Sequence, residues 1–247
     1  MRLAFASDMH GNLPAFEAVV AEIERRGPFD GIFGGGDSVI NGLYPSECVQ
    51  KLIDLGWPCV KGNADEWAVA CAGGTTGDVE LTPAEAGEVE DLLVRGRWTA
   101  ARLTDEQIEF LDGLPLSRTF TGPSCRTLML AHATPWSAHD AIRHNDPDDV
   151  KREAVDRAGT DALIYGHIHY AYQQEIDGKT ICCMGAVGLP NDGIPQPSFA
   201  IATDDRGSWS FEHIRVEYDN EAYAREVEAS DMPRAAAIAN LLRTGSA

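Results

Sequence analysis

Short apolar runs alternate with helical patterns in the first quarter of the chain. Residues 2–7 form a buried-strand pattern, and residues 14–26 then repeat apolar side chains at the i, i+3, i+4, i+7 spacing of an amphipathic helix. A second strand pattern at 30–36, a second helix at 45–55 and a third strand pattern at 58–62 continue the alternation. Because such units pack with right-handed crossovers, the pattern predicts parallel strands.

The rest of the chain changes character twice. Residues 64–115 carry two capping-box patterns, Thr82 to Glu85 and Thr104 to Gln107, which predict helices, and GGTTGD at 73–78 predicts a flexible link. Strand patterns follow at 125–131, 161–166, 180–188, 198–204 and 208–218, with helices at 147–158 and 220–243 and a hairpin turn at 204–207. We expect a single domain over 1–247, with 64–115 as a helical insertion near the site. The expected class is α+β, a four-layer α/β/β/α sandwich: two mixed β-sheets packed face to face, with helices on both outer sides.

Composition narrows the classes of function. The chain has 20 basic and 39 acidic residues, a net charge of −19, which disfavours long nucleic acid and anionic membranes as partners. No run of apolar residues is long enough to span a bilayer, and the first residues lack a signal-peptide pattern, so we expect a cytoplasmic, soluble protein. The six cysteines form no C-x-x-C pair and predict buried free thiols in a reducing compartment rather than a zinc site.

Side chains of the types that bind metals follow five of the predicted strands. They are Asp8 and His10, Asp37, Asn63, His132, and His167 with His169. The carboxyl ends of strands are where sites form in α/β sheets, and in extended backbone residues i and i+2 point the same way. Imidazole, carboxylate and amide groups together suit Mn, Fe, Co, Ni or Zn.

Each of these residues also has an ordinary structural interpretation. Taken alone, His132 is typical of a satisfied core histidine, Asp37 of a turn cap, Asn63 of a turn residue, and the pair His167 and His169 of either a turn or ligands. All of them together, in order after successive strands, favour a site for two metal ions.

The ordered motifs D-x-H (8–10), G-D (36–37), G-N-x-D (62–65), H (132) and G-H-x-H (166–169) resemble those of the calcineurin-like metallophosphoesterases. SDMHGNLPAFEAV and GAVGLPNDG resemble a bacterial and archaeal branch of small phosphodiesterases and phosphatases. The resemblance implies one ion on Asp8, His10, Asp37 and His169, and a second on Asp37, Asn63, His132 and His167. Asp37 would then bridge both ions.

The resemblance implies a phosphoesterase with two divalent metal ions, manganese first among them. A metal-bridging hydroxide would attack a small phosphorylated substrate, a phosphodiester (cyclic nucleotides included) or a phosphomonoester. Asp37, Asn63 and His132 would carry the catalysis. Many relatives have a histidine where this chain has Ala64, so we expect a phosphodiesterase rather than a monoesterase.

Four further residues are candidates for contacts to substrate or for orienting ligands: Asn12, Asp65, Arg143 and His144. We expect Asp65 to orient a ligand histidine and Asn12 to orient a ligand or the phosphate. His139 is a further candidate proton donor, although the loop that contains it, Arg143 and His144 also suits plain solvent exposure.

Two other functions compete with a phosphoesterase of small substrates. A non-catalytic protein-interaction scaffold on the same fold would be free to lose metal ligands, whereas all seven positions here hold suitable groups. A nuclease of the same superfamily is disfavoured by the acidic charge. The helices of 64–115 either cover the site or form the interface of a homo-oligomer.

Overall fold

The computed structural model describes residues 1–73, 83–205 and 207–246. The helices are α1 (Leu13–Arg26), α2 (Pro45–Leu55), α3 (Asn63–Gly73), α4 (Pro83–Ala100), α5 (Asp105–Asp112), α6 (Asp148–Ala158), α7 (Asn220–Glu228) and α8 (Ala235–Thr244). The strands are β1 (Arg2–Ala6), β2 (Gly31–Gly34), β3 (Ser117–Thr121), β4 (Thr127–Ala131), β5 (Ala162–Tyr165), β6 (Tyr172–Ile176), β7 (Lys179–Cys183), β8 (Ser198–Asp205) and β9 (Ser208–Arg215).

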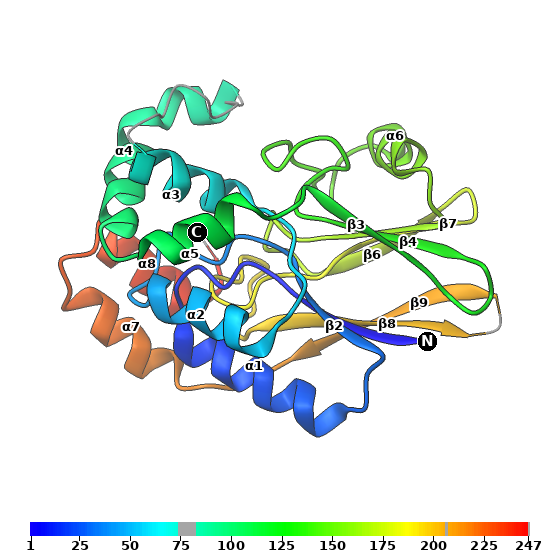
Figure 1. The fold of residues 1–247 in the computed structure, drawn as a ribbon, viewed down its shortest axis with the longest axis horizontal. Helices are drawn as coiled ribbons and strands as arrows, with labels where there is room; N and C mark the ends of the chain where they lie inside the picture. The colour runs from blue at the N-terminus through cyan, green and yellow to red at the C-terminus, as the bar shows by residue number, and fades with distance from the viewer. Residues whose placement is uncertain (74–82, 206, 247) are drawn as a thin grey trace.

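The strands form two mixed sheets that lie face to face (Figure 1). The first sheet has the order β2-β1-β8-β9, with β1 parallel to β2 and antiparallel to β8. The second has the order β3-β4-β5-β7-β6, with a parallel centre of β4, β5 and β7 between two antiparallel edge strands.

Three apolar clusters define four layers. Leu3 and Phe5 of β1 point between the sheets, where they meet Leu128, Leu130 and Ile164 of the second sheet. The alternate residues of β1 face outward into a cluster with α1 and α2, and the outer face of the second sheet packs on α6. Because β1 is covered on both faces, its sequence is apolar from Leu3 to Ala6 rather than alternating. The predicted α/β/β/α sandwich is confirmed.

The remaining helices gather at the end of the sandwich opposite the N-terminus (Figure 1). Helices α3, α4 and α5 share one apolar cluster around Trp67 and Leu111, and α7 packs on α8 in another. The capping box of Thr104 and Gln107 is present at the start of α5, as predicted. The predicted link at 73–78 and the capping box from Thr82 fall largely outside the described residues.

One strand prediction was wrong, and two strands were not predicted at all. Residues 58–62 touch β2 only through a bridge between Gly34 and Cys59, because Pro58 has no N–H to donate and the chain turns into α3 directly after Gly62. Strands β3 and β6 were not predicted, since these edge strands are half exposed and mostly polar. The predicted hairpin joins β8 and β9, but residue 206 of its turn lies outside the described residues.

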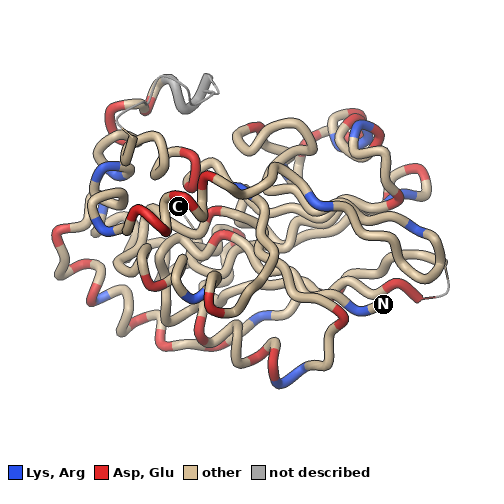
Figure 2. The backbone as a smooth tube through the Cα atoms, viewed as in Figure 1, with Lys and Arg blue, Asp and Glu red and all other residues tan. Residues whose placement is uncertain are grey.

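Acidic residues are spread along the outer helices, with fewer basic residues among them (Figure 2). Among the described residues, none of the helices has the length and apolar character that crossing a membrane requires. All six cysteines are free thiols; four of them are buried as predicted, whereas Cys71 is half-buried and Cys125 is exposed.

Candidate metal centre

The predicted ligand residues converge at one place, at the carboxyl ends of β1, β2, β4 and β5 and the start of α3. Their ligand-type atoms form two groups, each with all atoms within 4.8 Å of one another. The first group is Asp8, His10, Asp37 and His169, and the second is Asp37, His132 and His167. Asn63 Oδ1 adds an oxygen to the second group, 3.2 Å from His132 Nε2 and 3.1 Å from His167 Nδ1. Asp37 belongs to both groups.

The backbone at these positions is not extended, which corrects the reasoning from i and i+2 spacing. Asp8, His10, Asp37, His167 and His169 all have φ between +48° and +67°, in the left-handed region. Tight turns, not continued strands, therefore bring the paired side chains to one side. Such a conformation is uncommon outside glycine and clusters at functional sites, where the surrounding structure holds it.

Hydrogen bonds between loops hold this backbone. The amides of Asp8, His10 and Gly11 donate to carbonyl oxygens of residues 36, 37 and 38, so the turn after β1 is paired with the turn after β2. Gly188 N donates to Asp8 O, which adds the segment after β7. The turns thus support one another across both sheets.

Three of the histidines are fixed by backbone carbonyls. Nδ1 of His132 contacts Gly35 O at 2.8 Å, and Nδ1 of His169 contacts Leu189 O at 2.6 Å. Nδ1 of His10 lies 3.1 Å from Val39 O and 3.0 Å from Ile40 O. Because a carbonyl oxygen can only accept, each Nδ1 carries the proton and each Nε2 presents its lone pair to the centre.

These orientations fit cations. His10 Nε2 and His169 Nε2 lie 3.0 Å apart, and His169 Nε2 is 3.2 Å from Asp8 Oδ1. His132 Nε2 is 3.3 Å from Asp37 Oδ1. Lone pairs that face one another at such distances repel unless a proton or a metal ion lies between them. A mixed imidazole, carboxylate and amide set is one that transition metals accept.

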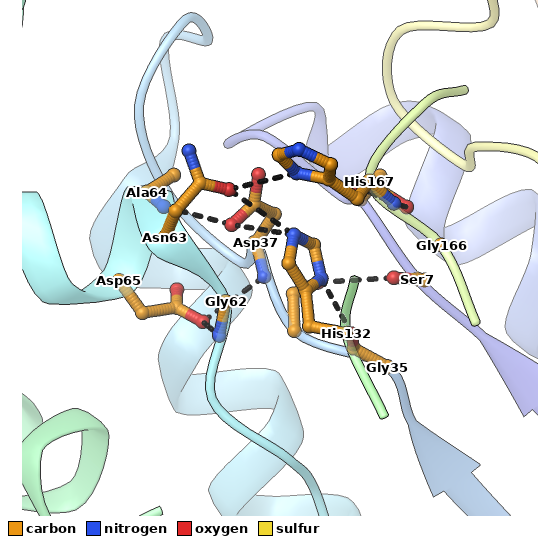
Figure 3. A network of polar contacts seen from close by, with 12 residues as sticks. Ser7, Gly35, Asp37, Gly62, Asn63, Ala64, Asp65, His132, Gly166 and His167 are labelled. Atoms are coloured by element: carbon orange, nitrogen blue, oxygen red, sulfur yellow. Dashed lines mark hydrogen bonds and ion pairs between the residues drawn. The ribbon is translucent and has the colours of Figure 1, made fainter. Parts of the chain in front are cut away.

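The first turn of α3 wraps around Asp37 (Figure 3). Ala64 N donates to Asp37 Oδ1 at 2.8 Å. In return, the Asp65 carboxylate accepts from the amides of Asp37, Ser38 and Gly62 at 2.9–3.0 Å. Asp65 therefore positions the backbone that carries Asp37, and the expectation that it orients a histidine was wrong.

Burial and charge act together on the acids of the centre. Burial alone would raise the pKa of Asp37, but His132 and its neighbours His10 and His167 hold that pKa well below its usual range. Burial, followed by the charge of Asp37, raises the pKa of Asp65 to about 7. Asp37 thus stays anionic and available to cations, while Asp65 serves its backbone partners.

Asn12 makes its polar contacts away from the centre, so it has no group free for the phosphate and keeps only the predicted support of a ligand residue. Its Oδ1 accepts from Ala15 N as the N-cap of α1, and its amide group donates to Gly188 O and to Tyr218 Oη. Every polar group of the side chain is thereby used, so Asn12 ties α1 to the segment that holds Asp8. No pattern in the sequence points to Tyr218 as a partner, because it lies 206 residues away.

A second supporting contact comes from α4. Arg95 is buried and donates to Asn41 Oδ1 at 3.1 Å and to Asp91 Oδ2 at 2.8 Å. Ile40 and Asn41 both have left-handed φ, 63° and 70°, and Ile40 O is a partner of His10 Nδ1. For a β-branched residue such a φ is a genuine outlier, so Arg95 helps to hold a strained turn behind His10. No motif in the sequence points to this role of Arg95.

The loop after His132 is only partly associated with the centre. Arg143 and His144 line a cavity of about 300 Å³ that His167 also borders. His139 is buried and its Nε2 contacts Glu66 Oε2 at 2.8 Å, so it braces α3. Ala64 presents only a methyl group.

Comparison with known proteins agrees with the geometry. A model of the calcineurin-like phosphoesterase superfamily domain matches residues 1–207. The uncharacterized protein MJ0912 of Methanocaldococcus jannaschii is 31% identical over 245 residues, which cover 92% of each chain. The crystal structure of a metallophosphoesterase from Sphaerobacter thermophilus is 26% identical, with a TM-score of 0.73 and 99% of each chain covered. The hypothetical protein PH1004 of Pyrococcus horikoshii shares the fold, with a TM-score of 0.80 at 18% identity over 100% of this chain and 99% of that one.

Proposed function

This chain belongs to the calcineurin-like phosphoesterase superfamily, and on that premise we propose that it is a hydrolase of phosphate esters that uses two divalent cations. Asp8, His10, Asp37 and His169 would hold one cation. Asp37, Asn63, His132 and His167 would hold the other. The observation that supports this most is the shared position of Asp37 between two groups of converging ligand atoms.

When bound, two such cations neutralise phosphate oxygens and activate water as a nucleophile. The chain's own residues orient the ligand side chains for that chemistry. The carbonyls behind His10, His132 and His169 fix which nitrogen faces inward. The amide of Ala64 and the carboxylate of Asp65 hold Asp37 between the two ligand groups.

We propose that phosphodiesters are preferred to phosphomonoesters. The side chain of Ala64, at the first turn of α3, cannot donate a proton to a departing oxygen. Esters with acidic leaving groups need that proton least. A phosphodiester also carries less negative charge than a phosphomonoester, so less positive charge is needed to neutralise it. Small esters suit the acidic chain better than long nucleic acids, whose phosphates would be repelled.

We also propose manganese as the working metal and the cytoplasm as the compartment. Carboxylate, amide and imidazole ligands together accept Mn²⁺, although Fe, Co, Ni and Zn also bind such sets. A reducing compartment suits the six free thiols. A non-catalytic scaffold would need no such ligand set, and the intact seven-residue set therefore favours catalysis.

The test compares metal-stripped protein with protein reloaded with Mn²⁺, using bis-p-nitrophenyl phosphate and p-nitrophenyl phosphate as substrates. We expect metal-dependent turnover that is faster on the diester. Asp37→Asn should abolish turnover while the protein stays folded, because one variant removes a ligand of both cations. As a matched control, Asp54→Asn changes an exposed acid on α2 and should retain activity. Two ions bound per chain without hydrolysis of either ester would refute the proposal.

A further inference from the structure

A cavity of about 300 Å³ lies directly beside the candidate metal centre. Its lining includes His167 of the centre, together with Arg143, His144, Tyr170 and Asn191. Because His167 borders the cavity, a phosphate ester bound at the centre can extend its organic group into this space. The residues that line the cavity therefore indicate the chemical class of that organic group.

Two of the lining residues form a flat aromatic stack. The rings of His144 and Tyr170 lie with their centroids 3.8 Å apart and their planes within 7° of parallel. Tyr172 meets the His144 ring edge-on, with centroids 6.4 Å apart and an angle of 68°. His144 is exposed, so its ring is accessible to a further flat group. Aromatic side chains present flat faces on which nucleobases stack.

The loop that presents His144 is held by buried groups. Tyr165 Oη donates to Ile142 O at 2.7 Å, and Lys151 Nζ donates to His144 O at 2.7 Å. Lys151 is only 3% exposed, which is rare for a lysine, and it also donates to Gln174 Oε1. Buried donors thus hold the carbonyls on both sides of Arg143, which fixes the backbone that presents His144.

Arg143 supplies positive charge to the same cavity. Its guanidinium is exposed and makes no hydrogen bond or ion pair with any of the residues that the structure describes. Guanidinium groups bind phosphate oxygens in a bidentate manner. Arg143 is therefore suited to an anionic oxygen of the ester whose flat group stacks on His144.

From this arrangement we propose that the cavity is the base-binding subsite of a nucleotide substrate. The inference rests on the proposed function and narrows it to phosphate esters of nucleosides. The base stacks on the pair of His144 and Tyr170, and Arg143 contacts the phosphate. Sugar phosphates that lack a base would reach only the centre and Arg143.

The experiment measures binding rather than turnover. Calorimetry on the Mn²⁺-loaded protein compares the phosphonate analogues of AMP and of ribose 5-phosphate, whose C–P bond is not hydrolysed. We expect the AMP analogue to bind on the order of tenfold more tightly, the range that one stacked base provides. His144→Leu and Tyr170→Leu should bring the ratio of the two affinities close to one. Arg143→Ala should weaken both ligands and leave the ratio unchanged.

Asn145→Ala is the matched control, because Asn145 is an exposed neighbour of His144 that does not line the cavity. It should keep the wild-type ratio. Equal affinities of the two analogues for the wild-type protein would overturn the subsite, as would a ratio that survives both leucine variants. Preference for the AMP analogue without turnover of any ester would instead refute the proposed catalysis and leave the subsite standing.

Discussion

Asp65 is the residue whose replacement tests the architecture of the centre most directly. Its carboxylate is fully buried and accepts three backbone hydrogen bonds, from Asp37 and Gly62 on Oδ2 and from Ser38 on Oδ1. Asp65→Ala leaves all three amides without a partner. Asp65→Asn keeps one oxygen for two of them, but its NH₂ group then faces the amide of Ser38.

The expected magnitudes follow from these counts. A buried donor left without a partner costs about 1–3 kcal/mol, so three of them give roughly 3–9 kcal/mol. The raised pKa of Asp65 shows that burial and the charge of Asp37 oppose its ionisation, and removing the charge returns part of the loss. We therefore expect a loss of about 3–5 kcal/mol for Asp65→Ala and about 2 kcal/mol for Asp65→Asn.

Urea unfolding of the metal-free proteins at pH 8 measures these losses, and calorimetry with Mn²⁺ measures the accompanying loss of metal affinity. Glu109→Gln, an exposed acid on α5, should stay within about 0.5 kcal/mol of wild type. A stability of Asp65→Ala within about 1 kcal/mol of wild type would refute this role of Asp65. An asparagine variant less stable than the alanine variant would refute it as well.

Three further predictions concern the surroundings of the centre and the pH dependence of stability. In Gly62→Ala the new methyl group would overlap Asp37 Oδ1, so we expect the metal content of the protein to fall at least tenfold. Atomic emission measures that content. The control Gly87→Ala adds a methyl group in open space on α4 and should bind metal normally. Arg95→Gln should weaken one of the two metal-binding steps in calorimetry, because it loosens the turn behind His10; equal weakening by the exposed Arg97→Gln would contradict this role. The hydrogen bond from Thr127 N, and to a smaller extent that from Arg126, lowers the pKa of Asp161 below its ordinary value of 3.8. The ionised Asp161 therefore stabilises the fold at neutral pH, and this contribution is lost as the pH falls below 3.8. The stability difference between wild type and Asp161→Asn in urea should accordingly be present at pH 7 and shrink at pH 3; a constant difference would exclude this linkage.

The elements that bury an apolar face were predictable, and those defined by distant partners were not. A run of apolar residues predicts strand β1, and apolar residues repeated at helical spacing predict helix α1. Strand β6 is an edge strand, YQQEI, whose pairing with β7 rather than its own composition makes it a strand. Pattern reasoning has no access to such pairing.

The same division holds at the candidate centre. The positions of the ligand-type residues after successive strands predicted their convergence. The backbone that achieves it was not predictable, because left-handed turns at Asp8 and His167 depend on bonds to residues far along the chain. Asp65 and Arg95 serve backbone and loop partners that come together only in the folded chain.

The convergence of residues from both sheets also bears on when the protein can acquire metal during its synthesis. The first candidate ligand is Asp8 and the last is His169, whose imidazole is in turn fixed by Leu189 O. Strand β8, which pairs with β1, follows later still. On an emerging polypeptide neither ligand group is complete until well over half of the chain has left the ribosome. We therefore expect cations to enter a nearly finished fold, so that a cell short of metal would accumulate assembled but empty protein.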